Sequence, residues 1–352
     1  MYFEDCKKQF EILKTKKNIK ILAIESSCDE TAIAVVENGR KILSNVVSTQ
    51  IDIHTRFGGV VPEVASRNHL LAIKHVCQKA LDDADLGFED IDAIAVTYGA
   101  GLIGALMVGV NYAKALAYAL NKPLLATSHI HGHIAGNYVS HPDLVPPFVC
   151  LMVSGGHTAI IKVDDYTDMH LLGTTVDDAV GECYDKVARV VGLGYPGGPK
   201  IDKLATQGQN IYHFANFSSL KDTYNFSFSG IKTAVINNVH NRKERGEELD
   251  IANIVCSFQE EVTDELCSKA IKACLDTNTK TLVCAGGVAA NSRLKEKLTR
   301  KCQEHNIKMY SPVLSLCTDN AAMIASAAYY NLRAGIGLAD LDLSAKSTVP
   351  IC

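Results

Sequence analysis

The hydrophobic and polar positions of the first 145 residues predict alternating strands and helices. An apolar run over 19–26 predicts a buried strand, and a turn at 26–29 separates it from a second strand over 31–36. A third strand is expected around 41–48. The pattern then predicts, in order, a helix over 64–84, a strand over 92–97, a Gly-rich turn over 99–104, a helix over 105–120, a short strand over 124–127 and a helix that begins near Ser128.

The same order of elements restarts near residue 148. Strands over 148–154 and 158–163 flank a Gly-Gly turn, and Thr158-Ala159-Ile160 echoes Thr31-Ala32-Ile33. The remaining expected elements are helices over 176–191, 201–207, 229–241 and 251–276, a charged solvated loop over 241–250, a strand over 281–285, a helix from 290, a strand-like stretch over 309–313 and a closing helix over 321–334. This repetition predicts an α/β fold of two related lobes with a ligand cleft between them.

The predicted boundaries follow from the two cycles of strands and helices. We expect a first lobe from 19–147 plus 318–352 and a second lobe from 148–317. Residues 1–18 carry lysines and acidic residues without an apolar signal core, so they are expected to form an N-terminal extension.

Composition limits the class of protein. A length of 352 residues suits about two domains, and 47% apolar residues suffice for a sizeable core in each. The chain has no apolar run of about 18 residues, so we expect no membrane span. A formal net charge of −4 argues against a general polyanion binder, although a local basic surface remains compatible with it.

The twelve cysteines are scattered, without a CxxC pair or a spacing typical of zinc ligation. Several lie in apolar helical or strand contexts, where a free thiol packs as a small hydrophobic group. So many unpaired thiols favour a reducing compartment, and we expect the protein in the cytoplasm.

Three histidines lie close together in Ser-His-Ile-His-Gly-His. On a helix, His129 and His133 share a face, whereas His131 points elsewhere. Two such imidazoles can bind one divalent metal, and helix histidines without a ligand are an equally open interpretation. The segment lacks the Glu of an HExxH motif, so a zinc protease is excluded. Asp319 is a candidate third ligand, with a plain helix N-cap as the alternative that the local sequence favours; two His and one Asp suit iron(II) or zinc.

Glycine-rich turns are the second candidate feature. Ser154-Gly155-Gly156 lies between two strands, where backbone N–H groups can approach phosphate oxygens, although an ordinary hairpin is the favoured explanation of this turn taken alone. Gly194-Tyr195-Pro196-Gly197-Gly198-Pro199 has an unusually constrained backbone. Gly286-Gly287 follows a strand, with Asn291 close behind at the start of a helix. Together the three turns favour a nucleotide ligand.

Charged residues cluster in three places. Glu25, Asp29 and Glu30 surround the first turn, and on the helix expected over 176–191 Asp178, Glu182 and Asp185 share one face. The third cluster, 293–301, is strongly basic. The last two are more often solvated helix faces than binding sites.

Nine stretches in order closely resemble the family of tRNA N6-adenosine threonylcarbamoyltransferases, formerly called O-sialoglycoprotein endopeptidases or glycoproteases, in its bacterial form. The resemblance runs from about Ile21 to the C-terminus. The matching stretches are Ala-Ile-Glu-Ser-Ser-Cys-Asp-Glu-Thr (23–31), 58–69, the His129/His133 pair, Val-Ser-Gly-Gly-His-Thr (153–158), Asp-Lys (185–186), Tyr-Pro-Gly-Gly-Pro (195–199), Phe-Ser-Phe-Ser-Gly-Ile-Lys-Thr-Ala (226–234), Gly-Gly-Val-Ala-Ala-Asn (286–291) and Cys-Thr-Asp-Asn-Ala-Ala-Met (317–323).

The resemblance implies a duplicated two-lobe fold of the actin, sugar-kinase and Hsp70 type. It implies transfer of a threonylcarbamoyl group from threonylcarbamoyl-AMP to the N6 amine of adenosine 37, in tRNAs that read codons beginning with A, with release of AMP. It also implies metal ligands at His129, His133 and Asp319 for one divalent ion, Fe²⁺ or else Zn²⁺. The implied substrate contacts are Met152, Val153, Ser154, Gly155, Gly156, Asp185, Gly198, Asp202 and Asn291.

The resemblance also implies partners: tRNA, a degenerate paralogue of the same fold, a small P-loop ATPase and the upstream synthase that makes threonylcarbamoyl-AMP. Asp29 and Glu30 are the candidates for the group that receives or orients the proton of the attacking amine. This assignment rests only on their expected position in the cleft. Two alternatives remain: a small-molecule kinase or ATPase of the same fold, which Glu25 at the first turn disfavours, and a non-catalytic scaffold. The sequence leaves open whether His131 joins the metal site.

Overall fold

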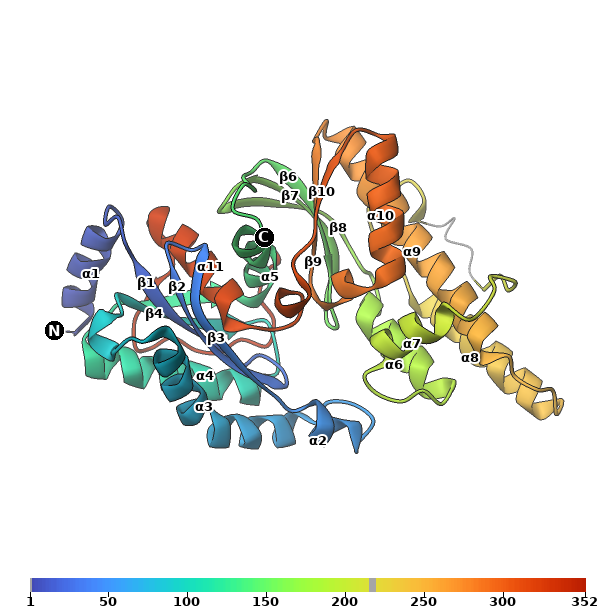
Figure 1. Ribbon diagram of the computed structural model, residues 1–352, viewed down its shortest axis with the longest axis horizontal. Coiled ribbons are helices and arrows are strands. Elements are labelled where there is room, and N and C mark those ends of the chain that lie inside the picture. Colours follow the sequence, from blue (N-terminus) through green and yellow to red (C-terminus); the bar gives the residue numbers. More distant parts are fainter. Residues whose placement is uncertain (1, 215–219) are drawn as a thin grey trace. The chain divides into compact units, whose positions relative to one another are not determined.

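The computed structural model describes residues 2–214 and 220–352, and the chain divides into two compact units (Figure 1). Unit 1 comprises Met1–Val145 and Pro312–Cys352, and unit 2 comprises Pro146–Ser311. Each unit contains one mixed β-sheet covered by helices. The chain therefore leaves unit 1 after Val145 and returns to it at Pro312.

The sheet of unit 1 has six strands. In spatial order they are β11 (Leu338–Ala339), β5 (Leu124–Ser128), β4 (Ala93–Gly99), β1 (Lys20–Glu25), β2 (Glu30–Glu37) and β3 (Lys41–Thr49). The β1, β2 and β3 strands form an antiparallel meander, whereas β4 and β5 run parallel to β1. Since β1, β4 and β5 are parallel, their carboxyl ends meet at one edge of the sheet.

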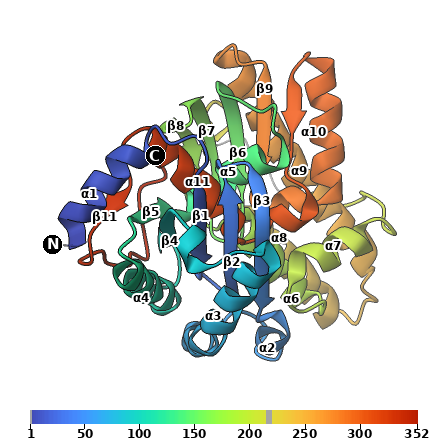
Figure 2. The ribbon, with the colours of Figure 1, turned by 60° about the vertical axis from the view of Figure 1, so that its left-hand side comes forward.

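Helices cover both faces of this sheet (Figure 2). One face packs against α3 (Pro62–Ala84) and α4 (Ile103–Leu120), and the other against α11 (Ala321–Arg333), which in turn packs on α5 (His129–Ser140). Strand β1 is buried on both faces, as the unbroken apolar run of its sequence predicts. The short helix α2 (Ile51–Thr55) leads into α3.

The first helix, α1 (Tyr2–Leu13), is an integral part of unit 1. Its buried residues Phe10 and Leu13 belong to the same apolar cluster as β1 and α11. The Arg333 guanidinium donates to the backbone carbonyl oxygens of Leu13, Lys14 and Lys16, and so holds the end of α1.

Unit 2 repeats the topology of unit 1. Its sheet contains, in spatial order, β10 (Lys308–Tyr310), β9 (Thr281–Ala285), β6 (Phe148–Val153), β7 (Thr158–Asp165) and β8 (Asp168–Thr174). The β6, β7 and β8 strands are antiparallel, while β9 and β10 run parallel to β6. Strands β6 to β10 thus correspond one by one to β1 to β5, and the predicted α/β duplication is confirmed.

The helices of unit 2 follow the expected order. They are α6 (Val180–Val190), α7 (Gly197–Ala205), α8 (Ser229–Glu244), α9 (Ile251–Asp276) and α10 (Ser292–Glu304), with short 3-10 turns at Gly287–Ala290 and, in unit 1, at Phe88–Asp90 and Leu314–Leu316. Of these helices, α8 and α9 begin at the predicted residues, whereas the starts of α6, α7 and α10 are shifted. The bounds of α9 and β9 are those that the sequence predicts.

Several predicted boundaries in unit 2 are wrong, among them those of α7, which is expected over 201–207 and spans Gly197–Ala205. The helix expected from 176 begins only at Val180, because the Asp177 carboxylate accepts from the backbone N–H groups of Phe228 and Ser229 and fixes a non-helical turn. The loop expected over 241–250 is helical as far as Glu244, where α8 ends. Its charged side chains face solvent on a helix, so charge density alone did not distinguish loop from helix.

Among the described residues, α4 alone has the length and hydropathy of a membrane-spanning helix. The core helix of an α/β layer meets the same criteria, and α4 packs against β4 and α3.

Candidate metal centre and glycine loops

The two histidines of the candidate metal centre lie one turn apart at the start of α5. This helix begins at His129 directly after β5, with Ser128 at the N-cap position, as predicted, although the Ser128 side chain makes no capping hydrogen bond. His129 and His133 are both buried, and their rings meet edge to face with centroids 4.6 Å apart. The carboxyl end of β5 therefore delivers both imidazoles to the sheet edge.

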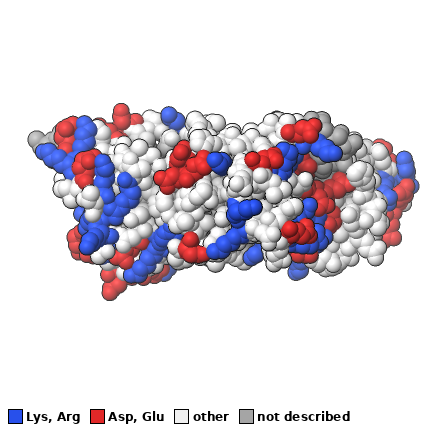
Figure 3. Space-filling model, turned by 90° about the horizontal axis from the view of Figure 1, so that it is seen from above, with Lys and Arg blue, Asp and Glu red and all other residues white. Residues whose placement is uncertain are grey.

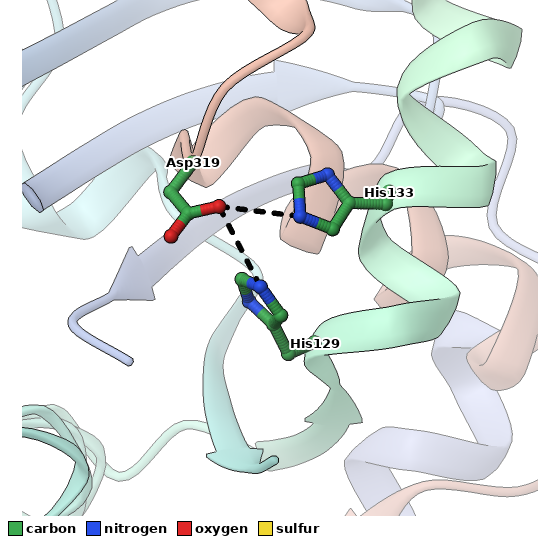
Figure 4. Close-up of side chains that lie close together, drawn as sticks. All are labelled: His129, His133 and Asp319. Carbon is green, nitrogen blue, oxygen red and sulfur yellow. Dashed lines mark ion pairs between the residues drawn. The ribbon is translucent and has the colours of Figure 1, made fainter. Parts of the chain in front are cut away.

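Asp319 comes to the same point from the segment that precedes α11 (Figure 4). Its Oδ1 lies 3.5 Å from Nε2 of His129 and 3.2 Å from Nε2 of His133. The plain N-cap interpretation of Asp319 is wrong, because Asn320 occupies the N-cap of α11 and its side chain accepts from the Met323 N–H. The Asp319 carboxylate is thereby directed at the two imidazoles.

The arrangement fits a divalent cation. The ligand atoms of His129, His133 and Asp319 lie within 4.8 Å of one another. Ligands about 2.1 Å from a common ion at tetrahedral or octahedral angles are roughly 3.0–3.4 Å apart, close to the 3.5 and 3.2 Å between Asp319 Oδ1 and the two imidazole nitrogens. Both ring nitrogens of His133 are buried, and neither makes a well-aligned hydrogen bond within the described residues, although Nε2 lies 3.2 Å from the Asp319 carboxylate. A buried imidazole so poorly satisfied is costly, and a cation at Nε2 would compensate it. Two imidazoles and one carboxylate suit Fe²⁺ or Zn²⁺.

Glu25 lies behind His129 at the end of β1 and is fully buried. Its Oε2 lies 3.2 Å from Nδ1 of His129 and accepts from the Thr97 hydroxyl at 2.5 Å, while Oε1 accepts from the Ser27 N–H at 2.5 Å. The Ser27 hydroxyl lies 3.1 Å from the same Nδ1. One ring nitrogen of His129 thus faces Glu25 and the other faces Asp319.

These contacts make the centre attractive to positive charge. Burial alone would lower the pKa of His129, but the carboxylates of Asp319 and Glu25 outweigh it and raise that pKa to about 9. Burial also opposes ionisation of Glu25, yet His129 and the hydrogen bond from Ser27 keep its pKa below the usual value. The centre therefore holds a proton where a metal would otherwise sit.

Asp29 lies in the turn between β1 and β2, and Glu30 is the first residue of β2, close enough to Asp319 for their charges to interact. Burial, then Asp319 and Asp29, raises the pKa of Glu30 to about 10. Asp29 is buried, and its Oδ2 has no hydrogen-bond partner among the described residues. His69 of α3 anchors this turn, because its ring nitrogens lie 2.7 Å from the Thr31 hydroxyl and 3.0 Å from the Cys28 carbonyl oxygen.

His131 turns away from the metal centre. Its Nε2 lies 3.1 Å from the backbone carbonyl oxygen of Ile351 in the C-terminal segment. Burial, only partly offset by this hydrogen bond, lowers the pKa of His131. The imidazole between the two candidate ligands therefore joins α5 to the C-terminal segment.

Unit 2 brings two of the three glycine turns together. The turn after β6 contains Ser154, Gly155 and Gly156, and the Ser154 hydroxyl accepts from the His157 N–H. Gly286 follows β9 with a φ of 94°, and a Cβ at this position would lie 2.4 Å from the Val153 carbonyl oxygen. A Cβ on Gly181, at the start of α6, would collide with the Ser154 carbonyl oxygen. Only glycine permits these backbones to approach so closely.

The third glycine turn is held by Asp185, whose Oδ1 accepts from the Gly197 N–H at 2.7 Å. Gly198 beside it has open space where a Cβ would be, as do Gly155, Gly156 and Gly287. These four positions therefore leave open space beside the backbone that a ligand could occupy.

Asp202 and Asn291 secure the start of α10. Asp202 accepts from the N–H and the hydroxyl of Ser292, and Oδ1 of Asn291 accepts from the Leu294 N–H. The Asn291 amide also donates to Gln259 at 2.8 Å. Both ends of the Asn291 side chain are thus engaged within the protein. Met152 and Val153, at the end of β6, are fully buried, and both pair with β7, so the protein itself covers these two residues.

Neither charged helix forms a single-sign surface. Lys186 bridges Asp178 and Glu182, and Lys232 pairs with Asp178, so these acids are compensated. On α10, Arg293 and Lys297 pair with Glu260. On the face drawn in Figure 3, Lys and Arg side chains are interspersed with Asp and Glu side chains.

From the sequence, Glu25 is one of the acids of the first turn, with no predicted role in the metal centre. Ser27, Thr97 and His69 are not predicted as site residues at all. Their contacts join residues far apart in the chain, such as Glu25 and Thr97. One sequence feature could have identified Glu25: it is a polar residue at the end of a buried strand, where the carboxyl ends of parallel strands meet.

Comparisons with known proteins agree with this geometry. A profile of the family TsaD, tRNA N6-adenosine threonylcarbamoyltransferase, matches residues 41–326. A tRNA N6-adenosine threonylcarbamoyltransferase of Clostridium perfringens is 56% identical over 329 residues, which cover 93% of this chain and 96% of that protein. One from Clostridium novyi is 55% identical, covering 94% and 97%.

Solved structures show the fold alone. Component A of the (R)-2-hydroxyglutaryl-CoA dehydratase of Acidaminococcus fermentans has a TM-score of 0.54 at 14% identity, covering 90% of this chain and 98% of its own. Full-length HypF, in a phosphate- and nucleotide-bound form, has a TM-score of 0.58 at 14% identity, covering 89% and 46%. Both have the actin-like α/β architecture, so the predicted fold class is confirmed. By its family profile and its relatives, the chain belongs to the tRNA N6-adenosine threonylcarbamoyltransferases, a family of transferases.

Proposed function

We propose that this protein transfers the threonylcarbamoyl group of threonylcarbamoyl-AMP to the N6 amine of adenosine 37, in tRNAs that read codons beginning with A, and releases AMP. The observation that carries the proposal is the convergence of His129, His133 and Asp319 in a chain of this family. They would hold one divalent ion, Fe²⁺ or Zn²⁺, which supplies a template and a Lewis acid for donor oxygen atoms.

The donor is a mixed anhydride, so AMP is a competent leaving group and the protein needs no nucleophile of its own. The N6–carbonyl bond forms, the bond between that carbonyl and the phosphate oxygen breaks, and the amine loses one proton. The adenine amine is a weak nucleophile, so alignment and stabilisation of charge on the carbonyl oxygen carry the rate.

Asp29 is the better candidate to accept the amine proton. Its Oδ2 is buried without a partner among the described residues, whereas burial and the carboxylates of Asp319 and Asp29 raise the pKa of Glu30 to about 10 in the metal-free chain. A protonated Glu30 can donate a hydrogen bond but cannot act as the base.

The glycine turns of unit 2 would bind the adenylate through backbone N–H groups. Ser154, Gly155 and Gly156 would face its phosphate, with Gly198 alongside, and the buried Met152 and Val153 would support this turn from the end of β6. Asp185, Asp202 and Asn291 would act by holding the turns in place, since each of them bonds backbone N–H groups there.

Partners and location complete the proposal. Besides tRNA, the protein would work with a degenerate paralogue of the same fold, a small P-loop ATPase and the synthase that supplies threonylcarbamoyl-AMP. The twelve cysteines are all free thiols and mostly buried, which suits the reducing cytoplasm.

The test is one incubation of the chain with threonine, bicarbonate, ATP, the synthase, the partner proteins and unmodified tRNA, read by nucleoside mass spectrometry. N6-threonylcarbamoyladenosine is expected with the wild type and with His131→Gln. It should be lost with His133→Ala and Asp319→Ala, whose far-ultraviolet circular dichroism should match the wild type. A wild type that makes no modified adenosine would overturn the proposal, and turnover of ATP without tRNA would favour a kinase or ATPase.

A further inference from the structure

The two histidines of the candidate metal centre differ in what lies behind them. Nδ1 of His129 faces the Glu25 carboxylate at 3.2 Å, whereas Nδ1 of His133 is buried and has no hydrogen-bond partner among the described residues. Both imidazoles face Asp319 through Nε2, but only His129 also has a carboxylate on its Nδ1 side.

The hydrogen bond of His129 decides which of its nitrogens is available to a metal. A proton on Nδ1 that is donated to Glu25 leaves the lone pair on Nε2, and Nε2 is the nitrogen that faces Asp319. The opposite tautomer would set a lone pair against the Glu25 carboxylate and a proton in the position of the metal. Glu25 thus selects the tautomer that can bind a cation.

Glu25 is itself rigidly placed. The Thr97 hydroxyl donates to Oε2, the same oxygen that lies near His129, and the Ser27 N–H donates to Oε1. Glu25 ends β1 and Thr97 belongs to the neighbouring parallel strand β4, so both side chains stand on the sheet itself. A fixed carboxylate of this kind holds a metal-binding imidazole better than a mobile one.

We propose that Glu25, held by Thr97, is a positioning residue that fixes the tautomer and orientation of His129 for metal binding. This inference rests on the proposed metal centre and adds a function to a buried acid outside the ligand set. Loss of such a partner typically weakens metal binding by about 10–100-fold.

The experiment measures metal affinity and ligand geometry, with no enzymatic readout. The full-length chain is stripped of metal with a chelator and then titrated with Zn²⁺ in competition with a chromophoric chelator. A parallel titration with Co²⁺ records its visible absorption, whose bands report the coordination geometry. The variants are Glu25→Gln, Thr97→Val and Ser27→Ala, with Glu37→Gln as a matched control, since Glu37 ends the neighbouring strand β2 and pairs with Lys41 at the surface.

We expect Glu25→Gln to raise the dissociation constant about 10–100-fold and to change the Co²⁺ spectrum, and Thr97→Val to raise it several-fold. Glu37→Gln should match the wild type, and Ser27→Ala should change the affinity less than Glu25→Gln does. If Glu25→Gln does not fold, the metal affinity of Thr97→Val tests the inference instead. That variant keeps the Glu25 carboxylate and removes only the hydroxyl group that donates to it.

Two results would overturn the inference. One is a Glu25→Gln variant, or in its absence a Thr97→Val variant, with the affinity and spectrum of the control. The other is a larger loss with Ser27→Ala than with Glu25→Gln, which would assign the positioning to the Ser27 hydroxyl. A wild type that binds no Zn²⁺ or Co²⁺ would instead refute the metal centre itself, and with it the basis of this inference.

Discussion

Metal affinity should depend steeply on pH, because His129 holds a proton where the metal would bind. The pKa of His129 rises from 6.5 to about 9, since the charges of Asp319 and Glu25 outweigh the effect of burial. Below pH 9 a metal must displace this proton, so each unit of pH should change the apparent affinity about tenfold. Between pH 7 and 9 the dissociation constant should therefore fall roughly 100-fold, and above pH 9 it should level off.

The same shift affects the stability of the metal-free chain. A difference of about 2.5 pKa units corresponds to roughly 3 kcal/mol at 1.36 kcal/mol per unit. Because the folded-state pKa is the higher one, this stabilisation is complete below about pH 6.5 and is lost as pH rises through 9. A metal-loaded chain lacks the His129 proton and should not show this loss.

The assay is competition with a chelator of known affinity, repeated at several values of pH between 6.5 and 9.5, with thermal unfolding of the metal-free and loaded chains alongside. His131→Gln is the matched control, because His131 lies on the same helix but bonds to Ile351. The His131→Gln variant should show the same change of metal affinity with pH as the wild type. An affinity that does not change between pH 7 and 9, after correction for the chelator, would refute the reasoning.

Three further predictions concern the framework around the two sites. Gly286→Ala should lower the free energy of unfolding by at least about 2 kcal/mol, because φ is 94° and the added Cβ would overlap the Val153 carbonyl oxygen. Gly287→Ala, the control, should lower it by no more than about 1 kcal/mol. Urea denaturation of the two variants measures the difference. His69→Ala should cost roughly 2–4 kcal/mol in the same assay, since it leaves buried hydrogen-bonding groups in the first turn unpaired, and a loss under 1 kcal/mol would contradict that role. Lys297→Met should lower the melting temperature without changing the salt dependence of tRNA binding, because its ammonium is buried against Glu260; a smaller salt slope would show that Lys297 contacts tRNA.

Much of the fold follows from local pattern. The strand over 281–285 and the helix over 251–276 were predicted with their observed bounds, since strong apolar runs and periodicity need no distant partner. The edge strand β8 (Asp168–Thr174) was missed because only one of its seven residues, Gly173, is buried, so the strand has no alternating apolar pattern. The start of α6 was misplaced because Asp177 bonds to residues some fifty positions further along the chain.

The candidate site shows the same division. Helical spacing alone placed His129 and His133 on one face, but it could not distinguish ligands from ordinary helix histidines. The position of Asp319 in the structure makes that distinction. The local sequence favours Asp319 as a helix N-cap, but Asn320 occupies the N-cap of α11. The distinction also required Glu25 and Thr97, whose contacts depend on the order of β1 and β4 in the sheet.

The sequence by itself determined the class of fold, the order of its elements and, through its motifs, the family. Those properties follow from short-range periodicity and from residues that are contiguous in the chain. Only the tertiary structure decided which polar side chains act together. Metal-binding geometry and hydrogen bonding act over about 3 Å in space, and the parallel sheet of unit 1 brings Glu25, Thr97 and His129 within that range.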